Sequence, residues 1–152
     1  MYRYGSIGPN HPDFDDKLCA MAPFLSRHSL VLIGLFIPID LWGKFGNAYV
    51  TVWWVDIVTH LLFGAWLAAI LLHPQLRHYA KSPLFIFALV LLAGLGWELF
   101  ELLYDVFVAV PRGITLAQHG AWDTLKDLLN NLLGAAAALW VLTKSPVYFK
   151  KF

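Results

Sequence analysis

Four long apolar stretches alternate with short polar segments along the chain. A helix that crosses a bilayer needs roughly 20 predominantly apolar residues, and the stretches predict such helices at about 24–42, 49–72, 83–110 and 121–143. Gly and Pro residues lie between them, as is typical of connecting turns. The pattern predicts an all-α integral membrane four-helix bundle.

The segments outside the apolar stretches predict how the bundle is oriented. Residues 1–27 form a polar leader in which one surface helix is expected, and residues 144–152 form a polar tail. Eight of the eleven Lys and Arg residues lie in the leader, the second connection and the tail. Because cationic residues are enriched on the cytoplasmic side of a membrane, both termini are expected in the cytoplasm.

Composition supports the membrane assignment and narrows the partners. The chain is 59% hydrophobic and 14% charged, whereas a soluble domain is about half apolar and about a quarter charged. Its net charge of +1 gives no reason to expect a nucleic-acid partner. The single Cys19 excludes an intramolecular disulfide. Membrane lipids and the helices of partner subunits are therefore the expected contacts.

Polar side chains recur at helical spacing in three of the four stretches. Residues three or four positions apart share one face of a helix, so each of the three helices carries one polar stripe. The stripes consist of Asp56 and His60, then Glu98, Glu101 and Asp105, then Asp123, Asp127 and Asn131. All three fall in the half of the membrane away from the termini, so they predict one acidic cavity open to the extracytoplasmic side.

The residue types in this cavity predict a bound divalent metal ion. A carboxylate inside a membrane is costly unless it is paired, coordinates a metal or faces water. We expect His60, Glu98, Glu101 and Asp127 to be the nearest ligands, followed by Asp56, Asp105, Asp123 and Asn131. Carboxylates with one imidazole favour zinc, manganese or iron over calcium or magnesium, although the spacing is not that of a motif such as His-Glu-x-x-His.

A bound metal would also make hydrolysis available. A metal ion acidifies water and polarises phosphoryl or carbonyl groups, and Glu101 is the candidate general base. The expected substrate is a lipid-linked molecule in the outer leaflet.

The same spaced residues carry a family resemblance over about Val50–Ala138. They read Asp56-x3-His60-x3-Gly64, Gly96-Trp97-Glu98-x2-Glu101-x3-Asp105 and Asp123-Thr124-x2-Asp127-x3-Asn131-x2-Gly134. This pattern resembles YjdF-like bacterial inner-membrane proteins and, more distantly, the VanZ-like family, in which a Gln is usual where this chain has Glu101. The resemblance implies a multi-pass protein of the bacterial inner membrane with this site, and it implies no particular activity.

Two other functions stay open at this point. In an accessory or assembly subunit of a larger membrane complex, the polar stripes would be interhelical hydrogen bonds. In a cation or proton carrier, the carboxylates would lie along the path of the ion, but the cytoplasmic half of the predicted bundle holds no further acids.

The remaining polar residues of interest lie near the two ends of the bundle. His119 is a candidate additional ligand at the outer mouth, where residues 113–120 are a candidate flap, and Lys126 is expected to pair with Asp123 at the surface. Haem ligation by residues at the opposite end is a weaker alternative, since no attachment motif is present. Those residues are His28, His73 and His78.

Overall fold

The computed structural model describes residues 27–73, 76, 82–117 and 119–144. Its elements are α2 (Arg27–Phe45), α3 (Ala48–Thr51), α4 (Trp54–Leu71), α5 (Pro83–Tyr104), the π-helical segment η2 (Asp105–Ala109), α6 (Val110–Arg112) and α7 (Ala121–Lys144). These residues include no strand, and four helical stretches are long and apolar enough to cross a membrane. The prediction of an all-α membrane bundle is confirmed. Most of the expected leader with its surface helix, nearly all of the tail, and His78 lie outside the described residues.

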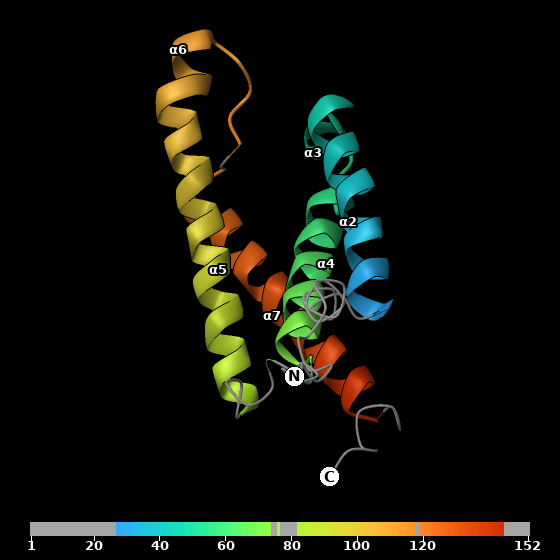
Figure 1. Cartoon of the computed structure of the whole chain (residues 1–152). Helices are drawn as coiled ribbons and strands as arrows, with labels where there is room; N and C mark the ends of the chain where they lie inside the picture. Colours follow the sequence, from blue (N-terminus) through green and yellow to red (C-terminus); the bar gives the residue numbers. More distant parts are fainter. Residues whose placement is uncertain (1–26, 74–75, 77–81, 118, 145–152) are drawn as a thin grey trace, which may run out of the picture.

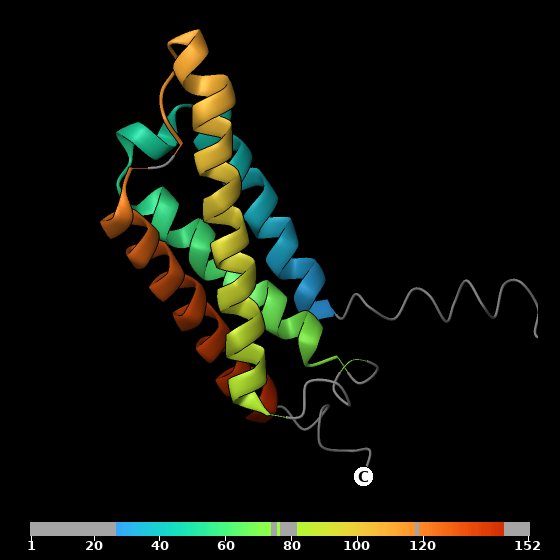
Figure 2. The same ribbon diagram turned by 90° about the vertical axis from the view of Figure 1, so that its left-hand side faces the viewer.

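The helices are arranged around a central pair, α4 and α7 (Figure 1). α2 packs against α4, whereas α5 packs mainly against α7 and has fewer contacts with α4. Figure 2 shows the same arrangement turned by a quarter rotation. α2 begins and α7 ends at one end of the bundle, while the short helices α3 and α6 lie at the other. The polar stripes belong to the end that carries α3 and α6.

Local sequence signals explain where the third span begins and how it ends. Ser82 caps α5, because its Oγ accepts a hydrogen bond from the Phe85 amide at 3.2 Å, and Pro83 occupies the first helical position. At the other end Pro111 has no N–H to offer the preceding turn, and the helix there widens into η2. Gly113 then ends α6 with a positive φ of 63°.

α4 and α7 approach each other closely where they cross. A Cβ atom on Gly64 would collide with the backbone of Asn131, and one on Gly134 would collide with the backbone of Leu61. The two backbones therefore touch directly, as small residues allow in membrane helices. His60 lies one turn before Gly64, and Asp127 lies one turn before Asn131. The crossing thus brings the side chains of His60 and Asp127 together.

Below this crossing, toward the end where α2 begins, the interior is apolar. The buried cluster there contains no charged side chain, and it comprises Ala68, Ala69, Leu72, Ile86, Val90, Ala135, Ala138, Leu139 and Leu142. The polar stripes therefore end at Asn131, and most of the remaining interior is apolar, although Ser29 on α2 is a buried polar residue there.

Candidate metal centre

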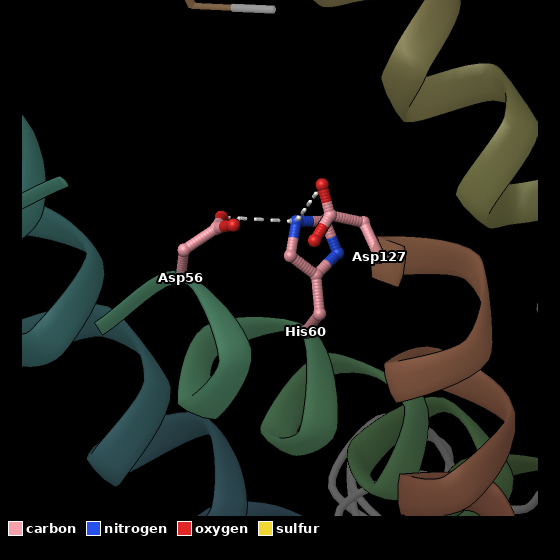
Figure 3. A group of neighbouring side chains, drawn as sticks. All are labelled: Asp56, His60 and Asp127. Atoms are coloured by element: carbon pink, nitrogen blue, oxygen red, sulfur yellow. Dashed lines mark ion pairs between the residues drawn. The ribbon is translucent and has the colours of Figure 1, made fainter. Parts of the chain in front are cut away.

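The central feature of the polar interior is a group formed by Asp56, His60 and Asp127 (Figure 3). Asp56 and His60 lie one turn apart on α4, and Asp127 comes from α7. His60 Nε2 is 3.5 Å from Asp56 Oδ1 and 3.8 Å from Asp127 Oδ2. Each residue offers one ligand atom, and the three atoms lie within 4.8 Å of one another. Among the described residues this is the one such group of three or more His, Cys, Asp or Glu side chains.

The two distances from His60 Nε2, 3.5 and 3.8 Å, lie close to those between neighbouring ligands of a metal ion. A tetrahedral ion with ligands at about 2.0–2.2 Å holds neighbouring ligand atoms roughly 3.3–3.6 Å apart. His60 and Asp127 are buried, with 8% and 2% of their surface exposed, and Asp56 is partly exposed. His60 and Asp127 each lie six residues after the first residue of their helix, or about 9 Å along its axis. The group therefore lies within the candidate spans, less than two turns from the first residue of each helix.

Lys126 lies beside this group and contacts three aspartates. Its Nζ is 2.7 Å from Asp56 Oδ2, 2.5 Å from Asp123 Oδ1 and 3.5 Å from Asp127 Oδ1. Asp56 and Asp127 thus each direct one carboxylate oxygen toward His60 and the other toward Lys126. The expected pairing of Lys126 with Asp123 is present, but the lysine also contacts Asp56 and Asp127, which sequence spacing did not predict.

Glu98 and Asn131 are buried next to this region without entering the three-residue group. Glu98 Oε2 accepts a hydrogen bond from Thr124 Oγ1 at 2.8 Å, whereas its Oε1 has no hydrogen-bond partner among the described residues. Asn131 is fully buried, and neither polar atom of its amide has a hydrogen-bond partner there. The Asn131 amide packs against Gly94, where a Cβ atom would approach its Nδ2 to 2.8 Å.

The other candidate ligands are held in separate contacts. Glu101 Oε1 accepts a hydrogen bond from the Trp97 indole at 2.8 Å. Asp105 is buried in η2, and its Oδ1 accepts from the Ala117 amide at 2.7 Å, which ties the expected flap to the helix. Asp123 pairs with Lys126 and lies 3.5 Å from His119. None of these carboxylates belongs to the three-residue group.

A second polar contact links α2 to the neighbouring segments at the same end. Asp40 accepts hydrogen bonds from Lys44 at 2.9 Å and from Tyr49 at 2.8 Å. Burial and the neighbouring Asp40 carboxylate raise the pKa of Tyr49 above its usual range, so the hydroxyl keeps its proton and acts as a donor. The Lys44 ammonium also lies 5.0 Å from the centre of the Trp97 ring. This contact joins α2 to α5.

These features define a helical membrane protein whose polar interior is built from three of its four spans. The chain belongs to the family described as Predicted membrane protein (DUF2238), whose model matches residues 21–146. The resemblance to YjdF-like proteins fits this family, whereas the more distant resemblance to VanZ-like proteins stays a prediction. No curated protein and no solved structure matches the chain.

Proposed function

We propose that this membrane protein binds one divalent metal ion between Asp56, His60 and Asp127. The observation that carries the proposal is the convergence of three ligand atoms within 4.8 Å, two of them on buried side chains. One imidazole nitrogen with two carboxylate oxygens suits zinc, manganese or iron better than calcium or magnesium, which prefer oxygen ligands alone.

The charge balance of the region supports a bound cation. The Lys126 ammonium faces three carboxylates, those of Asp56, Asp123 and Asp127. The imidazoles of His60 and His119, which also lie near these carboxylates, carry a charge only when protonated. Carboxylates are costly inside a membrane unless their charge is balanced. A divalent ion supplies the missing positive charge at the position where the aspartates face His60.

Hydrolysis of a lipid-linked substrate is the reaction that this arrangement favours. A site with three protein ligands leaves one position of a tetrahedral ion for water or substrate, as catalytic zinc sites do. A bound ion would supply the chemistry of acidifying water and polarising the bond to be cleaved, and Glu101 is our candidate for the general base. The depth of about 9 Å below the helix ends suits a bond near the headgroup of a lipid. We place this end outside the cytoplasm of a bacterial inner membrane, with both termini inside.

One observation favours a second candidate function, that of an accessory subunit in a larger membrane complex. Only 11% of the residues in the α2 span and 22% of those in the most apolar part of the third span are buried. Such surfaces suit partner helices as well as lipid. For a carrier, by contrast, the buried charged side chains of the described residues all lie at the end that carries α3 and α6, and the part below Asn131 holds none.

Elemental mass spectrometry of protein purified without chelators tests the metal proposal. We expect about one divalent ion per chain, and at least roughly tenfold less in Asp127→Asn, which keeps the shape of the side chain but loses its charge. Glu101→Gln is the matched control, because it removes a carboxylate outside the three-residue group and should keep the ion. Absence of metal from the wild type, or full retention by Asp127→Asn, would overturn the proposal.

A second measurement distinguishes an enzyme from an accessory subunit. Metal-loaded protein in vesicles should release phosphate or headgroup from lipid-linked substrates, and Glu101→Gln should keep the ion but lose this activity. A protein that carries the ion and releases nothing, and that co-purifies with a stoichiometric membrane partner, would favour the subunit.

A further inference from the structure

A groove between α2 and α7 lies at the end of the bundle opposite the metal centre. Both helices pack on α4, and small side chains of α4 and α7 leave a hollow of about 500 Å³ between them. Its walls are almost entirely apolar, and it is lined by His28, Val31, Leu32, Ala65, Ala137, Ala138, Val141 and Leu142. None of these residues belongs to the metal centre, so the groove is independent of the proposed function.

The position of the groove places it in contact with the hydrocarbon of one leaflet. Its lining residues belong to three of the candidate spans, and they lie in the first turns of α2 and the last turns of α7. Val31 and Val141 on its rim are 61% and 52% exposed, so the hollow opens sideways rather than into the protein. A ligand would therefore enter from the bilayer.

The length of the groove indicates whether its occupant is a helix or a lipid chain. On α2 the lining runs from His28 to Leu32, and on α7 from Ala137 to Leu142, which is roughly 6–8 Å along each axis. A spanning helix docks along a stripe of many turns, about 30 Å for a full crossing. The groove offers little more than one turn. The first carbons of an acyl chain can be held by a groove of this length. Its volume also falls within the range of about 300–1,000 Å³ that suits small ligands.

Two basic residues suit the phosphate end of a lipid: His28 lines the groove, and Lys144 follows its last lining residue, Leu142, by two positions. His28 lies at the start of α2, and Lys144 lies in the last turn of α7 with its Nζ 4.2 Å from the centre of the Trp140 ring. Lysine and tryptophan at the end of a span are typical of the headgroup region. The side chains of Lys144 and Trp140 are both exposed, and that of Trp140 is 63% exposed.

We propose that this groove is a binding site for one phospholipid, which places the first part of an acyl chain between α2 and α7 and its phosphate near His28 and Lys144. The bound molecule comes from the leaflet at the end where α2 begins, which is not the leaflet that the metal centre faces.

A pair of neighbouring alanines provides a matched test. Ala137 and Ala136 are both exposed, but only Ala137 lines the groove. Ala137→Phe fills the hollow, whereas Ala136→Phe adds the same ring outside it. Native mass spectrometry of protein released from bacterial membranes in mild detergent should find one phospholipid on the wild type and on Ala136→Phe. Retention should fall roughly tenfold in Ala137→Phe.

Photolabelling locates the contact. A phosphatidylethanolamine with a diazirine near the carbonyl end of one chain should label peptides that contain residues 28–32 and 137–142. Equal loss of lipid in both alanine variants, no retained lipid on the wild type, or labelling spread evenly along the spans would overturn the proposal. So would a dimer of the wild type that Ala137→Phe abolishes, since the groove would then hold a second copy of the chain. Circular dichroism confirms that each variant is folded.

Discussion

Lys126 lies 2.7 Å from Asp56, although seventy residues separate the two in sequence. The ammonium binds Asp56 Oδ2, while Asp56 Oδ1 faces His60 at 3.5 Å. Asp127 has the same arrangement, with Oδ1 toward Lys126 and Oδ2 toward His60. A tethered cation therefore stands on one side of both aspartates, and the position proposed for the metal lies on the other.

This arrangement predicts that Lys126 weakens metal binding. Its charge repels a divalent ion and draws the two aspartates toward itself, so Lys126→Met should raise the affinity for Mn²⁺ or Zn²⁺. We expect a gain of roughly tenfold, because solvent screens a lysine that is 41% exposed. Isothermal titration calorimetry in detergent measures this gain in affinity.

The matched control for this prediction is Lys44→Met. Lys44 pairs with Asp40 at 2.9 Å and contacts no residue of the three-residue group. Its removal should leave the affinity unchanged. Weaker binding in Lys126→Met, or an equal gain in both variants, would show that Lys126 does not compete with the ion.

The fold could be predicted because its signals are local. Each span is a long apolar stretch, and spacings of three and four residues place polar side chains on one helix face whatever the neighbouring helices do. The same logic grouped Asp56 with His60, and it separated the polar half of the bundle from the apolar half. The π-helical turn at Asp105 was not predicted, since it depends on how the chain accommodates Pro111.

The composition of the three-residue group Asp56, His60 and Asp127 could not be predicted in the same way. Helical spacing offered eight candidate ligands, and the structure brings three of them together. The choice depends on the crossing at Gly64 and Gly134, which sets how far each helix is rotated and translated against the other. Gly64 and Gly134 stand in the spaced motif, but the sequence does not identify which pair of helices meets at them. Lys126 was placed at the surface because its contact with Asp56 is non-local.

The crossing itself can be tested with Gly134→Ala. A methyl group there meets the backbone of Leu61 and Ala65, so α4 and α7 must separate. We expect the free energy of unfolding to fall by about 1–3 kcal/mol, and metal content to fall with it, because His60 and Asp127 move apart. Detergent-induced unfolding followed by circular dichroism measures the stability.

Gly96→Ala is the control for the crossing. Nothing lies within 4 Å of a Cβ atom at Gly96, so the variant should be as stable as the wild type, or more stable by up to about 1 kcal/mol through helix propensity. A stable Gly134→Ala protein with unchanged metal content would mean that the crossing does not position the site.

The hydrogen bond from Thr124 to Glu98 joins α7 to α5 inside the membrane. Glu98 is 5% exposed, and its other carboxylate oxygen has no hydrogen-bond partner among the described residues. Thr124→Val keeps the shape of the side chain but removes the donor, so we expect a loss of about 1–3 kcal/mol in the free energy of unfolding. Thr124→Ser should preserve most of the stability.

Thr143→Val serves as the control for this bond, because the Thr143 hydroxyl donates to the Leu139 carbonyl of its own helix. That variant should change the stability by less than Thr124→Val does. Equal losses in the two valine variants would indicate that the interhelical bond to Glu98 contributes nothing beyond the loss of a hydroxyl.

Asp105 should control the segment that precedes α7. Its Oδ1 accepts a 2.7 Å hydrogen bond from the Ala117 amide, and its side chain is buried. Asp105→Ala removes the acceptor, and hydrogen bonds to charged groups contribute about 1.5–3 kcal/mol. Hydrogen exchange at the Ala117 amide should therefore accelerate by at least roughly tenfold, as measured by exchange mass spectrometry. Asp105→Asn retains a carbonyl acceptor and should show a smaller increase, whereas Asp123→Asn should leave Ala117 unchanged. Unaltered exchange in Asp105→Ala would show that other contacts hold the segment in place.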